Sequence, residues 1–222
     1  MNRIELRDME NVVAQRIEAE KQERIDRILN AARKLFLEKG YLGATMRDIA
    51  LEAELSTGAI YVYFSGKDEI YEKVCEEAFM VVIGLIKKAA LVKGTPRDRI
   101  RAVAQQYVTF YTDYTEYFEM ITFHDLGFTK RGQSEHLRER LTDLTAEAIG
   151  IIEDVVAEGI ATGDFSSDLD STQTSFNLWA GLEGVLILDM MGYLKSFSLD
   201  QEKLVLSQLE ILLTGVMARN RE

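Results

Sequence analysis

The 222-residue chain contains few of the residues on which several other classes of protein depend. A single cysteine, Cys75, excludes an intramolecular disulfide framework and a zinc site with several thiolates, and this cysteine usage fits a reducing cytoplasm. A single proline leaves long stretches that can be helical. The longest apolar runs, such as residues 78–86, are too short to cross a bilayer, and the N-terminus has no apolar signal core. These absences favour an all-α cytoplasmic protein with no membrane partner.

Sequence patterns typical of enzymes are also absent. The chain has two histidines, His124 and His136, and no H-E-x-x-H sequence of the kind that binds a catalytic metal. It lacks the glycine-rich sequences G-x-x-x-x-G-K-[ST] and G-x-G-x-x-G that bind nucleotide phosphates. Cys75 lies in a helical pattern beside Val74 and Ala78, which is typical of a small core residue. We therefore expect no catalytic site, no metal and no cofactor.

The net charge of −11 is unevenly distributed along the chain. Residues 71–222 carry a net charge of −9, whereas residues 24–67 contain seven basic and five acidic side chains. Residues 24–67 are thus the only mildly basic block of the sequence. Because phosphate binding depends on the local placement of charge, the acidity of the whole chain does not exclude a nucleic-acid partner.

Helical periodicity organises the sequence. Apolar residues recur at intervals of three and four from Ile25 to Phe36, the pattern of a helix with one buried face, and Gly40 is placed to end that helix. Residues 1–20 are mostly charged and are expected to form a flexible or partly helical arm. Since no segment alternates at a period of two, we expect about nine helices and no sheet.

Helix start signals follow at intervals after residue 40. Thr45, Ser65 and Thr95 each precede an acidic residue by three positions, as in a capping box, and proline follows Thr95 at the first helical position. Ser56 and Ser198 are expected to begin two further helices. The expected helical ranges are 25–39, 45–53, 57–64, 67–91, 97–113, 116–124, 134–161, 170–193 and 198–219.

Residues 45–64 combine two short helical patterns that are joined by Glu54 and Leu55. Small or apolar residues stand where the helices of such a pair must touch, namely Ile49, Ala50, Ala53, Ile60 and Phe64. This is the pattern of a helix-turn-helix, whose second helix lies in the major groove of DNA. The first turn of that second helix, residues 56–59, is small, so its backbone can approach the edges of the bases.

Several side chains around this turn have the chemistry of DNA contacts. The hydroxyl of Thr57 can hydrogen-bond a base or a phosphate, and Ala59 can contact a thymine methyl group. Tyr61 and Tyr63 carry hydroxyls that can reach phosphates, and Lys67 adds a positive charge at the N-terminus of the next helix. The alternative for these residues is a structural role in an ordinary helical domain.

The order of these residues resembles the DNA-binding domain of the TetR (tetracycline-repressor) family. The shared features are T-x-x-x-I-A at residues 45–50 and G-x-x-Y-x-Y-F-x-x-K at residues 58–67, and the resemblance extends over about 45 residues. The residues that carry it are Ala31, Leu35, Phe36, Gly40, Thr45, Ile49, Ala50, Ala53, Ser56, Gly58, Ile60, Tyr61, Tyr63, Phe64, Lys67, Glu69 and Ile70. The resemblance implies an all-helical, homodimeric, ligand-responsive transcriptional regulator, usually a repressor.

The resemblance also implies which residues of this sequence face DNA. They are Thr45, Arg47, Ser56, Thr57, Gly58, Ala59, Tyr61, Tyr63 and Lys67. Two positions depart from the family pattern: Thr57 stands where many members carry lysine, and Val62 stands where many carry a polar or aromatic residue. Base recognition is therefore expected to use fewer charged contacts.

Aromatic residues concentrate between residues 107 and 128. At helical spacing such residues are most often core, but the tyrosines bring hydroxyls into an apolar region, which suits a pocket for an apolar or aromatic effector. His124 can anchor a polar atom of a ligand, and a capping or surface histidine is the alternative. The candidate ligand-binding residues are Tyr107, Phe110, Tyr111, Tyr114, Phe118, Phe123, His124 and Trp179.

The last two helical ranges carry more apolar residues than one buried face needs. A helix that is apolar on most faces must be covered on most faces, either by the chain's own core or by a partner. The resemblance implies a homodimer in which residues 170–193 and 198–219 of two copies form a four-helix bundle across a two-fold axis.

The sequence thus predicts a charged arm at 1–20, a helix-turn-helix domain at 21–67 and a helical domain for ligand binding and dimerisation at 68–222. The expected function is that of a repressor that binds a palindromic operator in double-stranded DNA as a homodimer and is released by a small, largely apolar effector. Two alternatives stay open: a helix-turn-helix regulator without a small-molecule ligand, and a helical small-molecule-binding protein with a vestigial DNA-binding segment.

Overall fold

The computed structural model describes residues 3–125 and 135–217, except for the side chains of residues 3–10, 12 and 123–125. In these residues the chain forms ten helices, and the only extended pairing is one antiparallel bridge between Phe165 and Met217. The all-α prediction is confirmed. The helices are α1 (Arg3–Gly43), α2 (Met46–Glu52), α3 (Thr57–Ile60), α4 (Lys67–Ala90), α5 (Pro96–Asp113), α6 (Thr115–Asp125), α7 (Glu135–Thr162), α8 (Ser171–Met190), α9 (Tyr193–Ser196) and α10 (Gln201–Val216).

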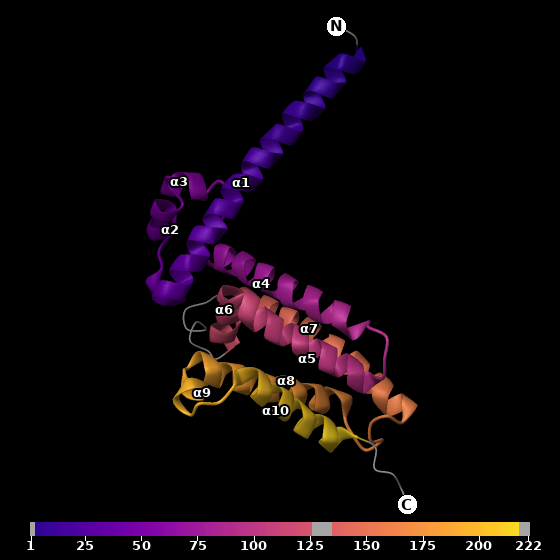
Figure 1. Cartoon of the computed structure of the whole chain (residues 1–222). Helices are drawn as coiled ribbons and strands as arrows, with labels where there is room; N and C mark the ends of the chain where they lie inside the picture. Colours follow the sequence, from indigo (N-terminus) through magenta and orange to yellow (C-terminus); the bar gives the residue numbers. More distant parts are fainter. Residues whose placement is uncertain (1–2, 126–134, 218–222) are drawn as a thin grey trace, which may run out of the picture. The chain divides into compact units, whose positions relative to one another are not determined.

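The chain divides into two compact units. The first contains Met1–Glu76 and Glu119–Glu139, and the second contains Glu77–Phe118 and Arg140–Glu222. In the first unit, α2 and α3 lie beside the C-terminal half of α1, and the N-terminal half of α1 projects beyond them (Figure 1). Among the helices of the described residues, none is long and apolar enough to cross a membrane.

α1 includes the residues expected to form an arm. Residues 3–20 are helical and extend the first helix. Side-chain pairs one turn apart support this exposed part; the Arg16 guanidinium, for example, lies 3.0 Å from the Glu20 carboxylate. Gly40 has φ +70°, which glycine adopts without strain, and it interrupts the helix where the sequence predicts its end.

The apolar face of α1 forms much of the core of the first unit. The buried residues of the predicted stripe are Ile28, Leu29, Ala32, Leu35 and Phe36, and Ile25 at the edge of the stripe is half-buried. Ala31 and Tyr41 of α1 are buried as well. Val74 and Cys75 of α4 are completely buried. The core position predicted for Cys75 is therefore confirmed.

The second unit combines apolar packing with ion pairs between helices. α8 and α10 pack along one another, and Gly181 permits a close approach, since a Cβ there would lie 2.6 Å from the Leu212 side chain. The Arg97 and Arg101 guanidiniums of α5 bind the Glu210 carboxylate of α10 at 2.8 and 2.7 Å. These two hydrogen-bonding partners, Arg101 first and then Arg97, lower the pKa of the Glu210 carboxyl to about 2.

The segment after α7 folds back onto that helix. Gly163 makes the turn with φ +81°, and the N–H of Phe165 donates to the carbonyl of Gly159 at 2.9 Å. The Phe165 ring is fully buried against Gly159, so closely that a Cβ on this glycine would overlap the ring. Gly159 is therefore required by packing and not by its backbone conformation.

Two predicted boundaries near the C-terminus differ from the structure. The helix expected at 170–193 is α8, and it ends at Met190 because Gly192 adopts φ +79°. The short helix α9 follows, so the described residues form ten helices where about nine were expected. The last helix, α10, is capped by Asp200 instead of Ser198. The Asp200 carboxylate accepts the N–H of Lys203 at 2.9 Å.

Candidate DNA-binding interface

α2 begins with the capping box predicted at Thr45. The Thr45 hydroxyl accepts the N–H of Asp48 at 3.1 Å, and the Asp48 carboxylate accepts the N–H and the hydroxyl of Thr45 at 3.1 and 2.7 Å. The hydrogen bond from the Thr45 hydroxyl is the main cause that lowers the pKa of the Asp48 carboxyl. Thr45 and Arg47 are exposed. The local sequence thus fixes the start of α2 while both candidate side chains stay open to solvent.

The turn between α2 and α3 is a Schellman motif. The N–H of Leu55 donates to the carbonyl of Ala50 at 2.9 Å, and the N–H of Glu54 donates to the carbonyl of Leu51 at 3.1 Å. Glu54 has φ +54°, a position at which glycine is usual. The sequence therefore contains no glycine signal for the turn that sets the direction of α3.

The first turn of α3 is capped and open to solvent. The Ser56 hydroxyl accepts the N–H of Ala59 at 3.1 Å, which confirms the predicted cap. Ser56 and Gly58 are exposed, and Thr57 and Ala59 are half-exposed. Since no side chain here is longer than threonine, another molecule can approach the backbone of this turn closely.

α3 is one turn of regular helix, whereas the sequence predicts a helix over 57–64. Beyond it the chain continues as hydrogen-bonded turns, in which the Ile60 carbonyl accepts the N–H groups of Tyr63 at 2.9 Å and Phe64 at 3.0 Å. A bond to the residue three positions back tightens a helix end, and the β-branched Val62 within this stretch has low helix propensity. The segment is therefore compact but only partly regular.

The surface after α3 includes one residue that sequence reasoning missed. Val62 is 77% exposed, compared with 54% for Tyr61, and Tyr63 is half-exposed. The departure from the family pattern at Val62 was the available signal. An exposed valine beside two tyrosines gives this edge of the surface an apolar side chain in addition to the tyrosine hydroxyls.

A small core supports the two helices from below. The five residues predicted to face inward, Ile49, Ala50, Ala53, Ile60 and Phe64, are all buried. Their burial confirms the side-chain pattern of a helix-turn-helix and leaves the opposite side of α3 exposed.

Basic residues of α1 hold α2 in place. The Arg27 guanidinium donates to the carbonyl of Ala53 at 2.7 Å, and the Lys34 ammonium pairs with the Glu52 carboxylate at 2.7 Å. Lys39 lies 3.5 Å from a third acceptor on α2, the Asp48 carboxylate. The hydrogen bond with Glu52 is the main cause that raises the pKa of Lys34. The mildly basic block at 24–67 thus uses part of its charge within the fold.

Lys67 also makes contacts within the first unit. Its ammonium donates to the carbonyls of Tyr41 at 2.6 Å and Ala44 at 2.9 Å and lies 4.4 Å from the centre of the Tyr41 ring. Burial lowers the pKa of this ammonium. Because an ammonium has three N–H groups and two are engaged here, a phosphate has at most one available from Lys67.

The start of α4 differs from the capping box predicted between Ser65 and Asp68. The Glu69 carboxylate accepts the N–H of Ser65 at 2.6 Å and its hydroxyl at 2.7 Å. The Asp68 carboxylate instead accepts the hydroxyl of Tyr41. A contact between distant residues therefore replaces the local one.

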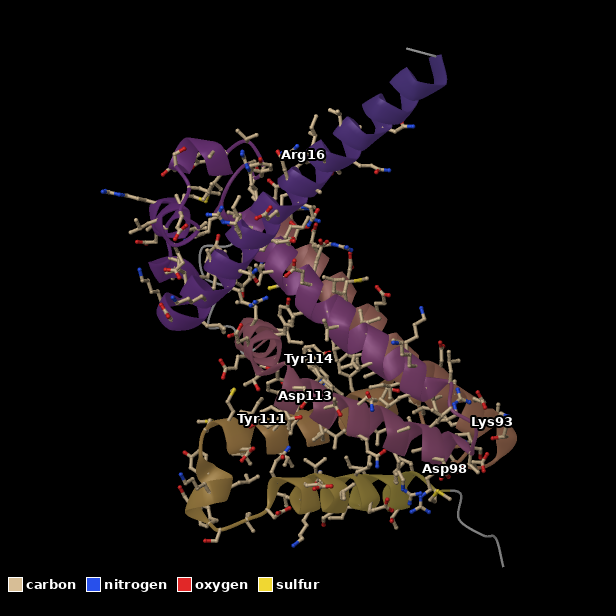
Figure 2. All side chains as sticks on the ribbon, turned by 45° about the horizontal axis from the view of Figure 1, so that its top comes forward. Arg16, Lys93, Asp98, Tyr111, Asp113 and Tyr114 are labelled. Atoms are coloured by element: carbon tan, nitrogen blue, oxygen red, sulfur yellow. The ribbon has the colours of Figure 1, made fainter. Side chains whose placement is uncertain are left out.

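The candidate ligand residues lie mainly in the second unit, where their hydroxyls meet carboxylates. The Tyr107 hydroxyl donates to the Glu183 carboxylate and accepts the indole N–H of Trp179 at 3.3 Å. The Tyr111 hydroxyl donates to the Asp189 carboxylate at 2.9 Å. Figure 2 labels Tyr111 near the C-terminal end of α5. The hydroxyls of Tyr107 and Tyr111 are thus already paired between α5 and α8.

The aromatic rings beside these tyrosines pack on one another. Phe110 and Phe118 are fully buried, and the Phe118 ring meets the Tyr111 ring edge to face at 5.0 Å between centres. Tyr114, which caps α5 and is labelled in Figure 2, is 39% exposed. The cluster therefore has core members and a surface member. The side chains of the other two candidates, Phe123 and His124, lie outside the described residues.

The helices expected to form a dimer expose an apolar face in the single chain. Phe176, Ala180, Gly184 and Leu188 of α8 are exposed and follow one another at intervals of four, so they share one face of the helix. On α10, Ile211 is 65% exposed. The expected range 198–219 extends two residues past the described part of the chain.

The first unit thus contains a capped helix, a tight turn and a second helix whose first turn is small and open to solvent. This arrangement over a buried core defines a class of protein, the helix-turn-helix regulators of transcription. The family sequence model described as "Bacterial regulatory proteins, tetR family" matches residues 28–74, and the one described as "Tetracyclin repressor-like, C-terminal domain" matches residues 96–191. Together they match more than half of the chain. The chain belongs to the TetR family of DNA-binding transcriptional regulators, a family of regulators and not of enzymes.

Characterised proteins resemble the chain over much of its length. The transcriptional repressor NicS of Pseudomonas putida is 25% identical over 144 residues, which cover 65% of this chain and 66% of NicS. The fatty acid metabolism regulator protein of Bacillus subtilis is 22% identical over 197 residues, 89% of this chain and 97% of that protein. The crystal structure of FadR from Bacillus subtilis in complex with stearoyl-CoA has a TM-score of 0.71 at 21% identity and covers 86% of this chain and 98% of that one, which shows the shared fold.

Proposed function

We propose that the chain is a cytoplasmic repressor that binds a palindromic operator as a homodimer and leaves it when a small, largely apolar or aromatic effector binds. The observation that carries the proposal is the first turn of α3, which is capped, small and open to solvent over a buried core. Membership of the TetR family supports it.

The proposed DNA-contacting surface follows the start of α2 and the whole of α3. Arg47 supplies a charge beside the groove, the backbone of residues 56–59 comes close to the base edges, and Tyr61 and Tyr63 extend toward phosphates. Its members are Thr45, Arg47, Ser56, Thr57, Gly58, Ala59, Tyr61 and Tyr63, with Val62 added from its exposure. Lys67, with two ammonium hydrogens engaged, contributes less to this surface than the family resemblance implies.

The proposed homodimer joins α8 and α10 of two copies. The exposed apolar face that contains Phe176 and Leu188 on α8, together with Ile211 on α10, supports this assignment because a face of this kind needs a cover. Two copies of α3 would then contact successive turns of the major groove, roughly 34 Å apart.

The proposed effector site uses the aromatic cluster of the second unit. Aromatic rings with a few paired hydroxyls suit a ligand that is apolar over most of the surface that enters the cluster. The FadR structure is a complex with stearoyl-CoA, whose acyl chain is apolar. α4 begins in the first unit and ends in the second, so it is the element proposed to transmit the effect. A coupling free energy of roughly 1–3 kcal/mol would change operator affinity about 5–150-fold.

Selection of bound DNA from a random duplex library tests the DNA side. We expect an enriched palindrome, whose binding weakens steeply with salt. The variant Arg47→Ala should lower the slope of log affinity against log salt concentration by about 1.8, because each copy in the dimer loses one phosphate contact. Lys93→Ala, an exposed lysine of the second unit, is the matched control and should leave the slope unchanged. Salt-insensitive binding, or no enrichment, would favour a helical small-molecule-binding protein.

The effector side is tested on the selected duplex with stearoyl-CoA, stearate and naphthalene as probes. We expect at least one apolar probe to lower operator affinity within the range of about 5–150-fold. Tyr107→Phe removes the hydroxyl that joins Trp179 and Glu183, and it should change the concentration of probe required but not the operator affinity without probe. A probe that binds the protein and leaves operator affinity unchanged would favour a regulator without a small-molecule ligand.

A further inference from the structure

The C-terminal end of α1 and the first turn of α4 are joined by a group of five side chains, the Tyr41 junction. It consists of Phe36 and Tyr41 of α1 and Lys67, Asp68 and Tyr71 of α4. The buried Tyr41 ring meets the Tyr71 ring at 5.1 Å and the Phe36 ring at 6.2 Å, and the Tyr41 hydroxyl donates to Asp68. Tyr41 is therefore contacted by three residues of α4, since the Lys67 ammonium lies over its ring.

The position of Lys67 in its helix makes its contacts informative. A cation at the first residue of a helix is unfavourable, because the helix dipole places positive charge there. The ammonium of Lys67 bends away to the carbonyls of Tyr41 and Ala44, which follow the interruption of α1 at Gly40. Lys67 thus binds backbone carbonyls of the segment before α2 and leaves the positive end of its own helix.

One of the two carbonyls that Lys67 binds belongs to the residue directly before the candidate interface. Ala44 is followed by Thr45, the N-cap of α2 and a proposed DNA contact. A displacement of the first turn of α4 would consequently move the Ala44 carbonyl and the start of α2. All of these residues belong to the first unit.

We propose that Lys67 is a positioning residue, whose ammonium links the first turn of α4 to the start of α2 and thereby delivers movements of α4 to the DNA-contacting surface. The inference rests on the proposed function for the meaning of that movement. It differs from the phosphate contact that the family resemblance implies for this residue, because the bonds to Tyr41 and Ala44 fix the ammonium within the protein.

Amide hydrogen exchange of the full chain without DNA tests the link directly. Lys67→Met keeps the length of the side chain and removes its charge and donors. We expect the amide of Asp48, which donates to Thr45, to exchange about tenfold faster in this variant, the effect of losing a charged hydrogen bond. Lys93→Met is the matched control and should exchange like the wild type. Wild-type exchange at Asp48 in Lys67→Met would overturn the proposal.

A second variant keeps the test decisive if Lys67→Met does not fold. Lys67→Gln removes the charge and keeps an N–H donor on a shorter side chain, so we expect an acceleration of exchange at Asp48 in the same direction. Unchanged exchange in Lys67→Gln would then overturn the proposal.

Salt dependence separates positioning from phosphate contact. On the selected duplex, we expect Lys67→Met to lower operator affinity about tenfold with an unchanged salt slope, whereas Arg47→Ala lowers the slope by about 1.8 for the two copies of the dimer. A slope lowered by about 1.8 in Lys67→Met would make Lys67 a phosphate ligand and overturn the inference. If the wild type binds no duplex, the proposed function fails, while the exchange experiment still decides the role of Lys67.

Discussion

The two candidate sites of this chain are built at different ranges along the sequence. In the first unit, the exposed turns are fixed by hydrogen bonds between residues three positions apart, as between Thr45 and Asp48. In the second unit, the aromatic cluster is fixed by side chains far apart in the sequence, such as Tyr107 and Trp179 at a separation of 72 residues. A capping bond within one helical turn can be changed without altering a second helix directly, whereas each change in a long-range network alters the packing of two helices together.

The largest expected effect tests whether the aromatic cluster is core. Phe118→Ala removes a fully buried ring and should lower the free energy of unfolding by about 3–5 kcal/mol. Denaturant unfolding followed by circular dichroism measures the change. Leu91→Ala, at an exposed position after α4, is the control and should change stability by less than about 0.5 kcal/mol. A loss below about 1 kcal/mol for Phe118→Ala would mean that this ring lines an open pocket and is not part of the core. The difference proposed between the two units would then not hold.

Substitution of two glycines of α7 should change stability by smaller amounts, with opposite signs. Gly159→Ala places a methyl group against the buried Phe165 ring and should destabilise the protein by about 1–3 kcal/mol. Gly150→Ala, with open space around the added methyl, should stabilise it by about 1 kcal/mol through helix propensity. Thermal unfolding measures both variants. Equal changes in stability would show that the Phe165 ring can move away from the added methyl group and that the second unit is not tightly packed there.

The capping boxes of α2 and α5 allow a matched comparison between the units. Thr45→Ala and Thr95→Ala each remove the same two bonds to the aspartate three positions later and should each cost about 1 kcal/mol of stability. Only Thr45→Ala should also weaken operator binding, because Thr45 lies on the proposed DNA surface. Equal operator affinities in the two variants would remove Thr45 from that surface.

The smallest expected effect concerns the ion pairs of Glu210. Its pKa is lowered to about 2 in the folded chain from an ordinary value of 4.5, so it contributes stability above about pH 4.5 that is lost as the pH falls toward 2. Glu210→Gln should therefore lower the melting temperature at pH 7, and the difference from the wild type should vanish near pH 2. Glu147→Gln, exposed on α7, is the control. A difference that is constant with pH would mean that the carboxylate charge is not what stabilises the pairing.

Elements with local signals could be predicted from the sequence. The caps at Thr45, Ser56 and Thr95, the helix end at Gly40 and the buried residues of α1 are found where the sequence predicts them. These features depend on residues within about one helical turn of each other, and their hydrogen-bonding chemistry is the same in any fold. Three predictions from local signals differ from the structure, namely the length of α3, the capping box at Ser65 and the cap at Ser198.

Features that depend on distant residues could not be predicted. Asp68 was expected to pair with Ser65, but it accepts the Tyr41 hydroxyl, 27 residues away, and Ser65 bonds to Glu69. Lys67 likewise reads as an exposed cation in the sequence and lies against Tyr41 in the fold. In both cases the competing partner comes from α1, and only the tertiary packing of α1 on α4 brings it within reach.

The single thiol of the chain has a practical consequence. Cys75 lies fully buried in α4, one residue before the position at which the chain passes from the first unit to the second. A water-soluble alkylating reagent reaches such a sulfur only when the surrounding helices open, so the labelling rate reports the frequency of that opening. Every molecule therefore carries a native reporter of breathing motions in α4, and a change in that rate on adding DNA or a small molecule can be followed by mass spectrometry without introducing any label site.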